Sequence, residues 1–165
     1  MTKTLHTHVE ATIPRPAEVV WDAVTDYATD TTWRKGITEM TPDRPGPPRV
    51  GTHVREVLQL AGREYVTDTT VTEVGPGMTY AFAGTGTSGT VRGRRTVTPH
   101  TSPGTSCFSY HVELEPDSLP RLARPILRWW LQHSLHRDLR RLRTLLETKH
   151  VPPRAHPQLN CPAAP

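Results

Sequence analysis

The sequence predicts an α+β domain in which a curved, seven-stranded antiparallel sheet wraps around one long C-terminal helix, with two short helices after the first strand. Three observations predict this class. Apolar and polar residues alternate near the N-terminus, extended segments separated by turn residues fill the middle, and leucines recur every three or four residues near the C-terminus. Helices that stand apart from an antiparallel sheet are typical of α+β domains.

The first strand and the two short helices occupy the N-terminal third of the chain. Residues 5–13 alternate apolar with polar, as a half-buried strand does. The prolines that follow end this strand and suit the first turn of a helix, whose apolar spacing continues to about Thr25. The small polar residues 26–32 then predict a break and a second short helical turn that leads to Trp33.

Six further extended segments follow. They are separated by glycine and proline turns, and a proline-rich loop at 41–48 interrupts the first two. The short turns make successive strands antiparallel neighbours. The predicted strands are residues 37–40, 53–60, 63–74, 78–84, 88–98 and 105–115.

A long amphipathic helix closes the predicted domain, 1–148. Ser118 is a suitable N-cap for a helix that starts at Leu119, and Pro125 is expected to kink or restart it. Leucines then form one stripe for about six turns. Residues 149–165 contain five prolines and few apolar residues, so we expect a disordered tail.

Composition and charge exclude several classes of protein. The 165 residues are 35% hydrophobic with a mean hydropathy of −0.53, which indicates one soluble domain. No apolar stretch approaches the roughly 20 residues of a membrane span, and no apolar leader follows Met1, so we expect a cytoplasmic location. The net charge is +4, but residues 121–150 carry eight basic and two acidic residues. Without a nucleic-acid motif, this uneven charge predicts no nucleic-acid partner, and the oligomeric state stays open.

The sequence predicts neither a metal site nor a cofactor. His6 and His8 lie two apart on the polar face of a strand, and His133 and His136 lie three apart on the last helix, but neither pair has a third ligand nearby in sequence. No Gly-x-Ser-x-Gly nucleophile motif is present. The catalytic residues, if any, cannot be named.

A ligand site is expected between the sheet and the last helix. The strands carry few large apolar residues, so a curved sheet around one helix should leave a concave apolar space. Tyrosines there would offer contact area and a hydroxyl group. Arg55, Arg92 and Arg94 are possible polarising groups, although their face of the sheet is ambiguous. The candidate lining residues are Trp33, Tyr65, Tyr80, Phe82, Tyr110, Trp130 and His133.

Four segments, residues 13–27 with Trp33, 71–77, 104–114 and 137–147, resemble the START-like, helix-grip superfamily (SRPBCC), which includes polyketide cyclase/dehydrases. The resemblance spans about residues 5–148 and implies a sheet that grips a C-terminal helix around a hydrophobic cavity. Members bind or transfer lipids, sterols and plant hormones, cyclise polyketides, or serve as subunits of larger systems. The fold therefore does not fix an activity.

The leading hypothesis is that the protein binds a hydrophobic small molecule of polyketide, lipid or isoprenoid type between the sheet and the C-terminal helix. The alternative is a polyketide cyclase/dehydrase, a lyase-type enzyme that shapes and dehydrates a bound intermediate. A third reading is an interaction or membrane-surface module that uses the basic, Trp129-bearing helix, with membrane contact a lesser expectation.

Overall fold

A computed structural model describes residues 4–87, 89–118 and 120–148, and the predicted tail lies outside this range. The described chain forms an antiparallel sheet of seven strands in the order β1-β7-β6-β5-β4-β3-β2. The strands are β1 (Leu5–Ile13), β2 (Ile37–Pro42), β3 (His53–Leu60), β4 (Arg63–Gly75), β5 (Thr79–Gly86), β6 (Gly89–Pro99) and β7 (Ser106–Pro116). The helices are α1 (Ala17–Thr25), α2 (Tyr27–Trp33) and α3 (Arg124–Thr148). The predicted α+β helix-grip fold is confirmed.

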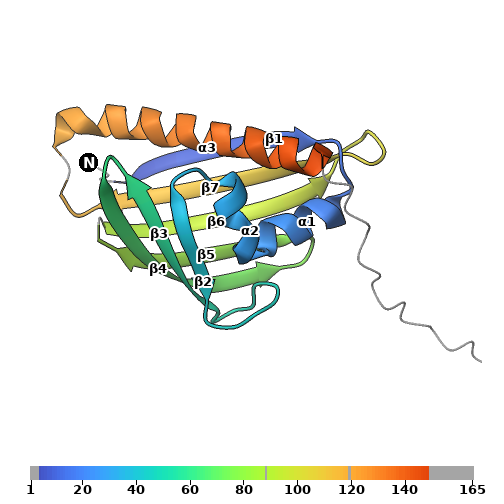
Figure 1. Ribbon diagram of the computed structural model, residues 1–165, viewed down its shortest axis with the longest axis horizontal. Helices are drawn as coiled ribbons and strands as arrows, with labels where there is room; N and C mark the ends of the chain where they lie inside the picture. The colour runs from blue at the N-terminus through green and yellow to red at the C-terminus, as the bar shows by residue number, and fades with distance from the viewer. Residues whose placement is uncertain (1–3, 88, 119, 149–165) are drawn as a thin grey trace, which may run out of the picture.

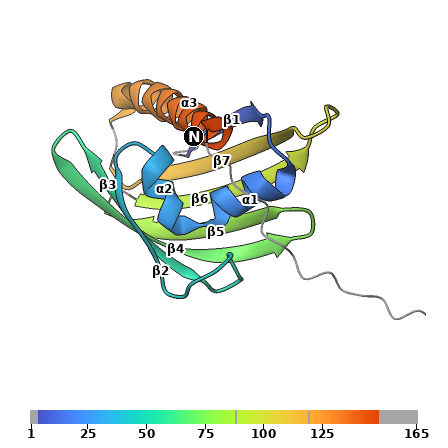
Figure 2. The same cartoon turned by 45° about the vertical axis from the view of Figure 1, so that its right-hand side comes forward.

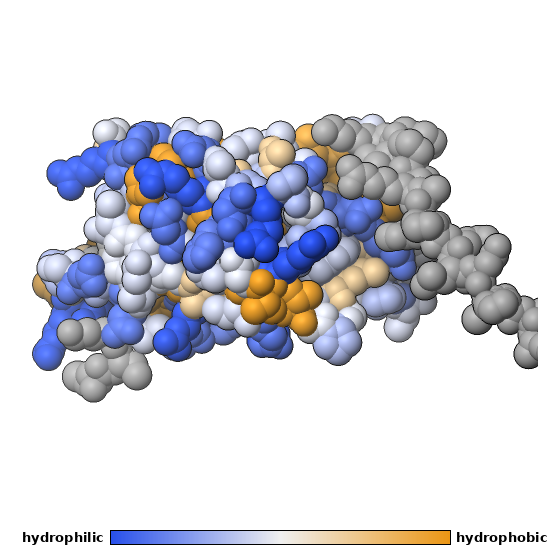
Figure 3. All heavy atoms as spheres, turned by 90° about the horizontal axis from the view of Figure 1, so that it is seen from below, coloured by the Kyte–Doolittle hydropathy of each residue, from blue (hydrophilic) through white to orange (hydrophobic). Residues whose placement is uncertain are grey.

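The sheet curves around the helices, which all lie on its concave side (Figure 1; Figure 2). α3 runs along β1 at one edge of the sheet, while α1 packs on β6 and β7 and α2 packs on β2. Two register irregularities, between Ile37 and Glu39 and between Val71 and Glu73, interrupt the ladders. Such bulges bend strands, and they support the curvature. Turned to show it from below, the molecule has a mainly hydrophilic surface with separate hydrophobic patches (Figure 3).

One hydrophobic core joins α1, α3 and the concave face near β1 and β7. Its α3 side is the predicted leucine stripe, and its sheet side includes Val9, Ile13 and Phe108. The stripe side chains that are buried are Leu135, Leu139, Leu142 and Leu146. The guanidinium of Arg15 holds the C-terminal end of α3. It donates hydrogen bonds to the backbone carbonyl oxygens of Leu146 at 2.7 Å and Glu147 at 3.0 Å.

The predicted start of the last helix was wrong. Leu119 lies outside the described residues, and the chain forms a short 3-10 turn at Arg121–Ala123 before α3 begins at Arg124. Pro125 explains the difference, because it has no N–H to donate to an earlier turn but is tolerated in the first turn of a helix. The helix therefore restarts beside Pro125, and this confirms the restart that the sequence predicts.

Candidate functional site

The concave face of the sheet carries alternate side chains of each strand. Strand register places every second residue of β5, β6 and β7 on this face, beneath α1, α2 and α3. The central strands contribute Tyr80 and Phe82 from β5, Gly93, Arg95 and Val97 from β6, and Phe108, Tyr110 and Val112 from β7.

Arg95 is a fully buried cation at the centre of this face, with only 1% of its surface exposed. Its guanidinium donates to both carboxylate oxygens of Asp30 on α2, at 3.1 Å and 2.5 Å, and to the carbonyl oxygen of Val24 on α1 at 2.7 Å. A buried charge is tolerated only when it is paired and hydrogen-bonded, and the two-pronged carboxylate contact meets this condition. Arg95 therefore ties the sheet to both short helices.

A second arginine extends this network. Arg34 Nη1 lies 2.5 Å from Glu56 Oε2 on β3 and 3.4 Å from Asp30 Oδ2. Burial alone would lower the pKa of Arg34 and of Arg95, but the neighbouring carboxylates outweigh it and hold both pKa values above the ordinary one. Both guanidinium groups therefore stay positively charged and do not act as acids or bases. Their contribution is electrostatic and structural.

Aromatic rings surround Arg95. Its guanidinium carbon lies 4.9 Å from the ring centre of Tyr110 and 5.3 Å from that of Trp33, within cation–π range. Phe108 contacts both rings, edge-on to Trp33 and stacked on Tyr110. Among the described residues, the Nε1 of Trp33 and the Nε of Arg95 have no hydrogen-bond partner. This half of the interior is thus filled by side chains, yet it keeps these two unused donors and a third, the Nε of Arg34.

Two buried tyrosines, Tyr27 and Tyr80, can form hydrogen bonds but are not bases at neutral pH. Desolvation raises the pKa of Tyr80 well above its usual value, and it also raises the pKa of Tyr27, although Arg95 and a hydrogen bond with Tyr80 oppose the shift at Tyr27. Both phenols stay protonated near pH 7. A proton-abstracting role on this face would need another group.

The structure separates the predicted lining residues by exposure. Trp33, Tyr80 and Tyr110 are buried around Arg95. Tyr65, Phe82 and Trp130 are half-buried. His133 is exposed, and its ring stacks on that of Trp129 with 5.3 Å between centres. A ligand contact at each of these seven residues stays a prediction.

The other half of the concave face is only partly covered. We call it the distal half and define it by the half-buried side chains Tyr65, Phe82, Val91, Val112 and Leu114. Strand register places them towards the end of the sheet at which β7 finishes, and the chain continues from there to α3. Gly93 belongs to the same area, because a Cβ there would come within 2.3 Å of Phe82 Cζ. The Phe82 ring therefore lies directly over the backbone of β6.

Sequence reasoning missed the buried ion pairs. Arg95 was one of three arginines in Arg92-Gly93-Arg94-Arg95, and the alternation of Arg95 with Gly93 and Val97 was the available signal for its inward direction. Asp30 had no such signal, because it lies in a short polar helix whose packing depends on tertiary contacts.

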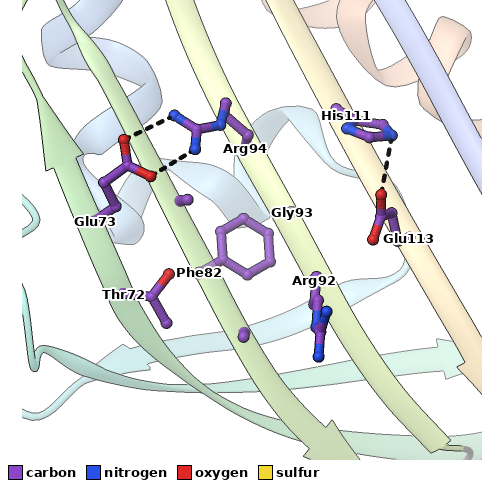
Figure 4. A pocket seen from close by; sticks show the side chains of 10 residues that line it. Thr72, Glu73, Phe82, Arg92, Gly93, Arg94, His111 and Glu113 are labelled. Carbon is purple, nitrogen blue, oxygen red and sulfur yellow. Dashed lines mark hydrogen bonds and ion pairs between the residues drawn. The ribbon is translucent and has the colours of Figure 1, made fainter.

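A separate depression of about 480 Å³ lies on the opposite, convex face of the sheet (Figure 4). Its lining includes Arg92, His111 and Glu113, and also Arg94, which binds Glu73 at 2.7 Å. Register places Arg92 and Arg94 on this convex face, and this resolves their ambiguous direction. The depression has a mixed lining, in which Ala81, Phe82, Ala83 and Gly93 accompany the charged side chains, and it is not the apolar space expected beneath α3.

The curved sheet, the two short helices on its concave face and the long α3 define a helix-grip domain. A comparison with protein families gives a match over residues 4–147 to the family described as "Polyketide cyclase / dehydrase and lipid transport". The chain belongs to this family. A search of curated proteins gave no match. None of the described helices has the length and hydropathy needed to cross a membrane.

Solved structures share the fold at low sequence identity. The protein TTHA0849 from Thermus thermophilus aligns with a TM-score of 0.73 and 16% identity, covering 86% of this chain and 97% of its own. The Zhui aromatase/cyclase from Streptomyces sp. R1128 aligns with a TM-score of 0.71 and 14% identity, covering 87% and 94%. A START superfamily protein from Mycobacterium smegmatis gives 0.72 and 15%, covering 86% and 97%. At these identities the likeness concerns the fold.

Proposed function

We propose that the protein binds a hydrophobic small molecule of polyketide, lipid or isoprenoid type against the distal half of the concave face, beneath α3. The observation that carries this proposal is the group of half-buried apolar side chains there, from Tyr65 to Leu114. Covering apolar surface is favourable by roughly 25 cal/mol per Å². The family description, which names polyketide chemistry and lipid transport, supports the same ligand class.

Polar groups at the inner end of this surface suit a ligand that carries oxygen atoms. Tyr80 and Tyr110 provide phenolic hydroxyl groups beside the charged Arg95. Apolar ligand sites commonly contain a few such groups, which orient the ligand. A carbonyl or hydroxyl at one end of an otherwise apolar molecule fits this arrangement.

Titration with the fluorescent fatty-acid analogue 11-(dansylamino)undecanoic acid tests the binding site. Phe82→Ala and Val112→Ala each remove apolar contact from the distal half, and we expect each to weaken binding about tenfold, equivalent to about 1.4 kcal/mol. The matched control is Arg94→Ala on the convex face, which should bind as the wild type does. Absence of probe binding, together with no apolar molecule in native mass spectra of protein from its own host, would reject the proposal.

The alternative function is cyclisation and dehydration of a bound polyketide. The family description and the fold likeness to an aromatase/cyclase favour it as the second candidate. The hydroxyl groups of Tyr80 and Tyr110 would orient the substrate carbonyls and donate hydrogen bonds to developing negative charge. Under this alternative, Tyr80→Phe and Tyr110→Phe lower the turnover of a poly-β-ketone surrogate by about 100-fold or more while probe binding persists. Equal turnover in both variants and the wild type counts against it.

A third candidate, contact between α3 and a membrane surface, is supported by exposed apolar side chains in the first turns of this helix and in the 3-10 turn that precedes it. Leu122, Ile126 and Trp129 are 89%, 68% and 65% exposed. They follow a helical spacing and are accompanied by exposed arginines, including Arg128. Such a face suits the interface of an anionic lipid bilayer.

A further inference from the structure

The convex face carries a cluster of metal-ligating side chains at the junction of β1 and β7. Strand register places His6 directly opposite Glu113, and His8 directly opposite His111. All four side chains point to the same face, because residues two apart in a strand share a side. The cluster therefore assembles from two strands that lie far apart in sequence.

Three of these side chains are close enough to share one ion. Ligand atoms of His6, His111 and Glu113 all lie within 4.8 Å of one another. The Nδ1 of His6 is 3.3 Å from Glu113 Oε1, and the Nε2 of His111 is 3.8 Å from the same oxygen. Tetrahedral zinc, with bonds of about 2.0–2.2 Å, separates its ligand atoms by roughly 3.3–3.6 Å. Small rotations of these partly exposed side chains bridge the difference.

We propose that His6, His111 and Glu113 form a binding site for a divalent transition-metal ion, with Zn²⁺ as the best match. Imidazole nitrogens together with one carboxylate oxygen favour Zn²⁺, Cu²⁺ or Ni²⁺ over Mg²⁺ or Ca²⁺, which prefer oxygen ligands. Three protein ligands leave a fourth position for water or another molecule, as in open zinc sites.

The surroundings of the cluster support an ion with one open position. His8 lies beside it, hydrogen-bonded to Ser109 at 2.8 Å and 3.3 Å from Glu10, so a further imidazole and a second carboxylate are at hand. His111 and Glu113 also line the convex depression that contains Arg92 and Arg94 (Figure 4). An anionic group in that depression would contact the arginines and could also occupy the open coordination position of the ion. Arg92, opposite Glu113 in the ladder, weakens the attraction for a cation but leaves a carboxylate and two imidazoles as ligands.

Isothermal titration of the untagged full-length protein with ZnCl₂ at about pH 7.5 tests this site. We expect one equivalent of Zn²⁺ to bind, and His111→Ala, Glu113→Gln and His6→Ala each to weaken binding at least about tenfold. Binding should also weaken at least about tenfold at roughly pH 5.5, because imidazole ligands must be unprotonated. Long-range ¹H–¹⁵N spectra of the imidazole rings give an independent readout, with shifts confined to the rings that bind the ion.

Two matched controls separate this site from other histidines. His133→Ala removes an exposed histidine from α3 and should leave the affinity unchanged. A variant lacking His150, His156 and Cys161, which lie in residues 149–165, should also bind as the wild type does. Absence of Zn²⁺ binding, or binding that survives His111→Ala but is lost in the 149–165 variant, would overturn the proposal. Melting temperatures of all variants should match that of the wild type, since the substituted side chains lie at the surface.

Discussion

At the scale of single residues, Arg94 and Arg95 are neighbours in sequence but occupy opposite faces of β6. Arg95→Met leaves Asp30 buried with one of its two cationic partners missing, so we expect the free energy of unfolding to fall by about 3–5 kcal/mol. Arg94→Met breaks an exposed pair with Glu73, and we expect it to leave the free energy of unfolding nearly unchanged. Urea unfolding followed by circular dichroism measures both changes.

A double variant sharpens this comparison. Arg95→Met combined with Asp30→Asn removes the unpaired charge, and we expect it to recover part of the stability that Arg95→Met alone loses. Similar losses for Arg94→Met and Arg95→Met, or no recovery in the double variant, would contradict the assigned role of the buried pair.

Asp138 on α3 provides a pH-dependent test. Burial raises the pKa of its carboxyl group above the ordinary value of 3.8, although the Lys35 N–H donates to it at 3.0 Å. The folded state therefore disfavours ionisation, and stability present below pH 3.8 is lost as the pH rises through the raised pKa. Asp138→Asn keeps an acceptor for Lys35 without the charge. We expect its melting temperature to match that of the wild type at about pH 3 and to exceed it at about pH 7. A melting temperature below that of the wild type at about pH 7 would contradict a destabilising charge on Asp138.

At the scale of an element, α3 has two halves with different surroundings. Its C-terminal half buries Leu139 and Leu142, whereas its N-terminal half exposes Ile126 and Trp129. We expect Trp129→Ala to reduce co-sedimentation with phosphatidylserine vesicles several-fold at low salt and to leave the unfolding free energy nearly unchanged. Thr144→Ala, an exposed change in the other half of α3, is the control. Sedimentation that ignores both Trp129→Ala and added salt would exclude this surface as a membrane contact.

At the scale of the whole molecule, we propose that residues 1–148 fold as an independent domain. The family match ends at residue 147, and Arg15 binds the last turns of α3 through Leu146 and Glu147. A chain that ends at Thr148 should melt at the same temperature as the full-length protein. A chain that ends at Leu142 lacks the hydrogen bonds from Arg15 and the buried Leu146. We expect its free energy of unfolding to fall by about 2–5 kcal/mol. Scanning calorimetry distinguishes these outcomes. If the chain that ends at Thr148 melted below the full-length protein, residues 149–165 would contribute to stability and the proposed domain boundary would be wrong.

The order of elements could be predicted because periodicity is a local property of the sequence. Alternation in residues 5–13 and the leucine spacing of α3 indicated their structures without knowledge of any partner. The start at Leu119 was predicted wrongly because Ser118 is a good cap by type, whereas the expected restart at Pro125 is confirmed, because α3 begins at Arg124.

The sites depended on pairings that no local pattern contains. The Arg95 contact with Asp30 spans 65 positions and needs α2 to lie on the sheet. The neighbourhood of His6 and Glu113 needs the register of β1 against β7. The sequence therefore identified aromatic candidates such as Tyr80 and Tyr110 but not the cation between them.

The arginines of β6 also have a consequence for how the sheet assembles. Sliding this strand by a single position would turn both Arg92 and Arg94 inward, where α2 offers one carboxylate, that of Asp30, and would turn the buried Val97 away from the core. Hydrophobic patterning acts in the same direction, since Val91 and Val97 both lie on the inner side of β6 and its outer side carries threonines and arginines. Ion pairing and apolar burial together thus favour the observed alignment of the central strands.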